Sequence, residues 1–120
     1  MISASRLPRL LRIAAYAACL AVIAALSLAP SEDLPAPNLS DKSEHAITYA
    51  VLTALSFALF PKHPRLAVAS AIAFGVAMEF AQGAMNLGRQ ADWQDAAANG
   101  LGVLFVALSY GVWRRVARRT

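Results

Sequence analysis

The apolar positions of this chain fall into four blocks separated by short polar connections. The blocks are Leu10–Ala29, Ala46–Phe60, Leu66–Met85 and Ala96–Trp113. A helix that crosses a membrane needs about 20 mostly apolar residues, and the first and third blocks have that length. The second and fourth reach it only when their polar N-terminal flanks, residues 41–45 and 92–95, are counted as helix. A soluble amphipathic bundle would not show such blocks.

This pattern predicts an all-α fold, an integral membrane four-helix bundle that forms a single domain over residues 1–120. The expected spans are 10–29, 42–60, 66–85 and 94–113. The first block also resembles a secretory signal peptide, since basic residues precede it. We expect a retained anchor instead, because the stretch is long and Pro30 stands where cleavage would fall.

Composition and charge support a membrane protein with both termini in the cytoplasm. The chain is 58% hydrophobic and only 15% charged, against roughly 25% charged in soluble domains. Nine of its eleven basic residues precede the first span or stand in its first turn, lie between spans two and three, or follow span four. The positive-inside rule makes that side cytoplasmic. We therefore predict a multi-pass protein of the inner (cytoplasmic) membrane with the lipid bilayer as its partner. The basic excess reflects topology, and we expect no nucleic-acid binding.

Three of the four predicted helices carry one polar face, because residues three and four apart share a face. The second helix groups Asp41, Lys42, His45, Thr48, Tyr49, Thr53 and Ser56. The third groups Gly75, Glu79, Gln82, Gly83 and Asn86. The fourth groups Asp92, Asp95, Asn99, Gly102 and Ser109. A charge at the bilayer centre costs about 2.5–3.5 kcal/mol on insertion scales, so we expect these faces to turn inward and form an outward-facing polar pocket.

The titratable groups of this pocket, Glu79, Asp95 and His45, are candidate catalytic residues for acid–base chemistry. Arg89 and Lys42 are candidate anion contacts. The alternatives remain open: Glu79 with Gln82 also fits an interhelical hydrogen-bond lock, and Asp92 fits an N-cap. A metal site from the three titratable groups is weakly indicated, since the chain offers one histidine there and no spacing motif. We predict no metal and no cofactor.

Two stretches resemble the VanZ-like family of small bacterial membrane proteins. "SDKSEHAITYAVL" (40–52) is similar to that family's Asp-Lys-x-x-His…Tyr segment, and "MEFAQGAMNLGRQADWQDAAANGLG" (78–102) is similar to its second signature. The motif positions that the resemblance assigns to a binding site are Asp41, Lys42, His45, Tyr49, Glu79, Gln82, Arg89, Asp92, Asp95 and Asn99. The family's namesake is associated with resistance to the glycopeptide teicoplanin, so the resemblance implies a role in the cell envelope.

Three functions compete at this stage. The first is a membrane protein whose pocket binds an envelope component, either a lipid-linked wall precursor or a glycopeptide. The second is an intramembrane hydrolase or transferase that acts on a lipid-linked envelope substrate, with Glu79 or Asp95 as general base. The third, a transporter, ranks last, because four short spans leave little room for alternating access. We make no prediction of an oligomeric state.

Overall fold

The computed structural model describes residues 3–29, 41–85 and 91–120, and these residues form helices joined by short connections. A short 3₁₀-helix, η1 (Ala4–Arg6), precedes four α-helices: α1 (Arg9–Leu28), α2 (Asp41–Leu59), α3 (Pro64–Met85) and α4 (Trp93–Arg119). The predicted all-α fold with four helices is confirmed. The helices extend into the two polar flanks as predicted: α2 begins at Asp41, and α4 begins directly after Asp92.

Local chemistry explains where the helices begin and end. Pro64 is the first residue of α3, where its fixed φ and missing N–H are tolerated. α2 ends two residues before Pro61. The carbonyl of Leu59 at this end accepts a hydrogen bond of 3.0 Å from Nη1 of Arg12, which satisfies one of the unpaired carbonyls of a helix C-terminus.

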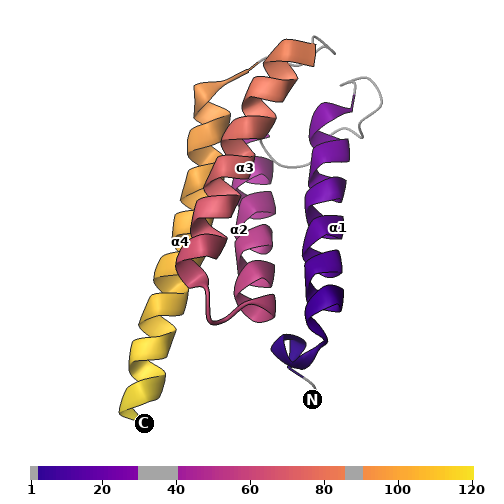
Figure 1. The fold of residues 1–120 in the computed structure, drawn as a ribbon. Helices are drawn as coiled ribbons and strands as arrows, with labels where there is room; N and C mark the ends of the chain where they lie inside the picture. The colour runs from indigo at the N-terminus through magenta and orange to yellow at the C-terminus, as the bar shows by residue number, and fades with distance from the viewer. Residues whose placement is uncertain (1–2, 30–40, 86–90) are drawn as a thin grey trace.

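The four helices run up and down, and both chain termini lie at the same end of the molecule together with the α2–α3 turn (Figure 1). α2 and α4 approach closely near Gly102. A methyl group built on Gly102 would overlap the carbonyl oxygen of Ala46 and would lie 2.9 Å from its carbonyl carbon. Only glycine therefore permits this approach of the two backbones.

The core is thin, and most large apolar side chains point outward. Ile23, Tyr49, Leu52, Ala71 and Val103 form the buried cluster. By contrast, α1, α3 and α4 all expose large apolar side chains, such as Leu10 at 80%, Phe80 at 73% and Phe105 at 70%. A contiguous surface of this kind is rare on monomeric soluble proteins and suits contact with lipid.

Three of the described helices, α1, α3 and α4, are long and apolar enough to cross a membrane. α2 is not among them, because its first turn carries Asp41, Lys42 and Glu44. The structure therefore fits a membrane protein. Its most polar helix, α2, contacts all three other α-helices, as α3 also does.

Candidate functional site

A group of polar side chains joins the N-terminal turns of α2 and α4 to the C-terminal part of α3. These helix ends lie opposite the end that holds the chain termini (Figure 1). We call this group the polar cluster; its members are Lys42, His45, Glu79, Asp92, Asp95 and Asn99. The helical periodicity that predicted three polar faces explains why these residues point to one place.

Glu79, the one acid of α3, is buried, with 6% of its surface exposed. Its Oε2 accepts a hydrogen bond of 3.1 Å from the backbone N–H of Asp92, so the carboxylate connects α3 to the start of α4. Its Oε1 lies 4.0 Å from Nδ1 of His45. This oxygen is buried and has no hydrogen-bond partner among the residues that the structure describes.

Asp92 is the N-cap of α4, as predicted. Its backbone is extended, and its side chain accepts a hydrogen bond of 2.8 Å from the backbone N–H of Gln94. Nζ of Lys42 donates to Oδ2 of Asp92 at 2.8 Å and also donates to Oδ1 of Asp95. The Lys42 ammonium, followed by the Gln94 N–H, holds the pKa of Asp92 below its usual value. Lys42 therefore connects the first turn of α2 to two acids of α4.

His45 lies between the two buried acids. Its Nε2 is 3.6 Å from Oδ2 of Asp95, and its Nδ1 is 2.9 Å from Oδ1 of Asn99. Asp95 is 7% exposed and Asn99 is 2% exposed. Because an amide oxygen only accepts, the hydrogen bond to Asn99 places the ring proton on Nδ1.

Tyr49 is buried beside the polar cluster, near Asn99. A methyl group built on Gly75 of α3 would lie 3.0 Å from Cε1 of Tyr49 and 3.2 Å from Nδ2 of Asn99. Gly75 thus admits a tyrosine of α2 and an asparagine of α4 against α3. The Tyr49 hydroxyl and Asn99 Nδ2 are both buried without a hydrogen-bond partner in the described part of the chain.

The structure places three other residues of the predicted polar faces elsewhere. Gln82 is buried, but its amide donates a hydrogen bond of 2.8 Å to the carbonyl of Ser27 on α1. It therefore connects α3 to α1, and Glu79 and Gln82 serve different contacts. Gly83 and Ser109 are exposed. The predicted residues Arg89 and Asn86, and the side chain of Asp41, lie outside what the structure describes.

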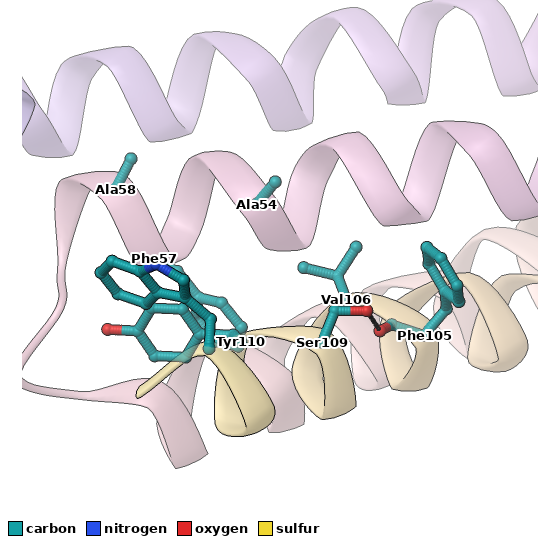
Figure 2. A pocket seen from close by; sticks show the side chains of 8 residues that line it. Ala54, Phe57, Ala58, Phe105, Val106, Ser109 and Tyr110 are labelled. Atoms are coloured by element: carbon teal, nitrogen blue, oxygen red, sulfur yellow. Dashed lines mark hydrogen bonds between the residues drawn. The ribbon is translucent and has the colours of Figure 1, made fainter. Parts of the chain in front are cut away.

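An apolar hollow of about 430 Å³ lies between α2 and α4, toward the end that holds the C-terminus. Its lining residues are Ala54, Phe57, Ala58, Phe105, Val106, Ser109, Tyr110 and Trp113, and Figure 2 shows Phe57 beside Tyr110 at one end. These two rings are 4.6 Å apart between centroids. Sequence analysis missed this hollow. The aromatic residues near the end of the fourth block were its only sequence signal.

The polar cluster has the groups that acid–base chemistry or anion binding requires. It combines an imidazole between two carboxylates with an ammonium that is 40% exposed. One atom each from His45, Glu79 and Asp95 lies within 4.8 Å of the other two, a spacing that a bound cation also fits. Comparison with family models, with curated proteins and with solved structures finds no match to this chain.

Proposed function

We propose that this chain is a four-span protein of the bacterial inner membrane whose polar cluster binds the polar headgroup of a cell-envelope component. The observation that supports this most directly is the meeting of Lys42, His45, Glu79, Asp95 and Asn99 from three helices at one end of an otherwise apolar bundle. Buried polar groups at membrane depth mark binding sites and pathways by default.

The distribution of charge supports an extracytoplasmic position for the polar cluster. η1 and the start of α1, the α2–α3 turn and the end of α4 lie at the opposite end of the molecule (Figure 1). These three segments, together with Arg65 in the first turn of α3, contain nine of the eleven basic residues. Under the positive-inside rule that end faces the cytoplasm, which gives an N-in/C-in topology and an outward-facing polar pocket at the cluster.

The chemistry of the polar cluster indicates the class of ligand. The half-exposed ammonium of Lys42 lies at its rim, while the acids and Asn99 lie deeper. A headgroup with hydroxyl or amide groups would donate hydrogen bonds to the carboxylates, and a phosphate on it would contact only the ammonium at the rim. A phosphate-linked sugar of a wall precursor, or a glycopeptide, has these groups. The VanZ-like resemblance of residues 40–52 and 78–102 supports the same assignment.

Single substitutions Glu79→Gln, Asp95→Asn and His45→Ala test this proposal. Cells that depend on the protein are assayed for glycopeptide susceptibility and for wall-precursor content, while membrane abundance is measured by immunoblotting. We expect each variant to lose the phenotype at wild-type abundance. Glu44→Gln, which makes the same chemical change one residue from His45, is the matched control. If activity and abundance fall together in all three variants, the cluster is structural.

A second candidate function, an intramembrane hydrolase or transferase, is favoured by one contact. Nδ1 of His45 donates to Oδ1 of Asn99 at 2.9 Å, which orients the ring and makes Nε2, 3.6 Å from Oδ2 of Asp95, the candidate general base. Purified protein incubated with a polyprenyl-phosphate-linked sugar would then release product with a bell-shaped pH profile. Absence of product at every pH, together with retained binding of the lipid, would leave the binding function alone.

A further inference from the structure

One oxygen of the polar cluster lacks a partner. Glu79 is 94% buried, and its Oε1 has no hydrogen-bond partner in the described ranges of the chain. The basic group facing it, Nδ1 of His45, is 4.0 Å away, which is beyond hydrogen-bond distance. A buried carboxylate oxygen is unfavourable unless a proton donor or a cation contacts it. Among the described residues, Oε1 of Glu79 therefore lacks the proton donor or cation that a buried carboxylate oxygen requires.

The charge of the polar cluster also favours a bound cation. Three of its side chains are carboxylates, Glu79, Asp92 and Asp95, and its one ammonium belongs to Lys42. With Lys42 as the one ammonium, the formal charges of these described members leave a negative excess. Two buried acids beside a single ammonium, as in the described part of the cluster, are costly in a medium of low dielectric. A divalent cation would cancel this excess.

His45, Glu79 and Asp95 each make a hydrogen bond to a further group of the protein, as metal ligands commonly do. Each acid uses one oxygen elsewhere: Oε2 of Glu79 accepts the Asp92 N–H, and Oδ1 of Asp95 accepts from Lys42. The other oxygen of each acid faces His45. The ring of His45 donates through Nδ1 to Oδ1 of Asn99, which directs the lone pair of Nε2 toward Asp95. Ligating histidines and carboxylates are oriented by such hydrogen bonds.

We propose that the polar cluster holds a divalent transition-metal ion whose ligands are Nε2 of His45, Oε1 of Glu79 and Oδ2 of Asp95. In a tetrahedral site with bonds of about 2.0–2.2 Å, ligand atoms lie roughly 3.3–3.6 Å apart. Nε2 and Oδ2 are already 3.6 Å apart. Each of the three side chains offers one ligand atom within 4.8 Å of the other two. Oε1 of Glu79, which lies 4.0 Å from Nδ1 of His45, would have to move toward Nε2 when the ion binds.

The ligand set favours Zn²⁺ or Mn²⁺, because imidazole suits the former and carboxylates suit the latter. Three protein ligands leave one position for water or for an oxygen of a bound molecule. This inference goes beyond the proposed function, because the ion needs no headgroup in order to bind. The sequence indicated this site only weakly, because its three ligands come from different helices and form no spacing motif.

The test is the metal content of the full-length protein, purified in detergent through a tag without histidines. After exchange into metal-free buffer, protein loaded with Zn²⁺ or Mn²⁺ is analysed by mass spectrometry of the elements. We expect about one ion per chain. Glu79→Gln, Asp95→Asn and His45→Ala should each lower that content at least about tenfold, and Asn99→Ala should weaken affinity about 10–100-fold. Glu44→Gln should bind like the wild type.

A second measurement keeps the inference testable if the ligand variants fold poorly. The melting temperature of the wild-type protein should rise with Zn²⁺ and fall with a chelator, and Co²⁺ should give a visible absorption band. Wild-type protein that binds no ion and shows no shift with Zn²⁺, Mn²⁺ or Co²⁺ would overturn the inference. Equal metal content in wild type and all ligand variants would also overturn it. Headgroup binding without any ion would refute the metal site and leave the proposed function standing. Ion binding without headgroup binding would refute the proposed function and leave the metal site standing.

Discussion

Gly102 offers the sharpest test of how this bundle is packed. The substitution Gly102→Ala adds a methyl group that would overlap the carbonyl oxygen of Ala46 and would lie 2.9 Å and 3.1 Å from its carbonyl carbon and Cα. These are backbone atoms, so no side-chain rotation relieves the overlap. α2 and α4 must therefore separate at their closest contact.

The magnitude follows from two opposing effects. Overpacking of this kind typically costs about 1–3 kcal/mol, and a rigid backbone neighbour places Gly102→Ala near the upper limit. Alanine regains at most roughly 1 kcal/mol of helix propensity. We therefore expect a net loss of about 2 kcal/mol. The effect should extend to the polar cluster, because Gly102 lies two turns beyond Asp95 and Ala46 adjoins His45.

The assay is reversible unfolding in mixed micelles of a mild detergent and dodecyl sulfate, followed by circular dichroism. Gly100→Ala is the matched control, since nothing lies within 4 Å of a methyl group built there. It should leave stability unchanged or raise it by up to about 1 kcal/mol. The two variants should differ by about 2–3 kcal/mol, roughly 30–160-fold in the unfolding equilibrium. Equal stability of the two variants would refute the close contact of α2 and α4.

Two further predictions concern contacts between helices. Gln82→Leu removes the hydrogen bond to the Ser27 carbonyl and should lower the free energy of unfolding by about 0.6–1.7 kcal/mol in the same assay. The control Gln94→Leu, on the exposed start of α4, should leave that free energy unchanged. Equal effects of the two substitutions would contradict a specific α1–α3 contact. At the N-cap of α4, Asp92→Asn keeps an acceptor for the Gln94 N–H but loses the charge facing Lys42, and Asp92→Ala loses both. Melting temperatures should therefore fall in the order wild type, Asn, Ala, and an unchanged alanine variant would show that the cap is dispensable.

The four helices were predictable because hydrocarbon-length apolar blocks and prolines are local features. The polar flanks that the block lengths demanded are helical, since α2 starts at Asp41 and α4 at Trp93. α4 continues to Arg119, six residues past the predicted end of the span at 113. Arginine is a good helix former, so the end of an apolar block does not end a helix.

The buried faces were also predictable, because a period of 3.6 residues fixes which side chains share a face. Tyr49, Glu79, Asp95 and Asn99 lie buried where this period placed them. The same period grouped Gln82 with Glu79 and Ser109 with Asp95. Gln82 instead faces α1, and Ser109 is exposed and bonds to the carbonyl of Phe105 in its own helix. A helical face has a width, and neighbouring positions on it contact different helices.

The sequence by itself determined that four helices form from apolar blocks that suit a membrane, and that the polar residues of three of them lie on one face each. These properties depend on hydropathy and helical geometry, which are local. Only the tertiary structure decided that Oε1 of Glu79 and Oδ2 of Asp95 both face His45, that Lys42 contacts two acids of α4, and that Gly102 meets Ala46. Such contacts depend on the distance and rotation between helices, which arise from the packing of every side chain between them.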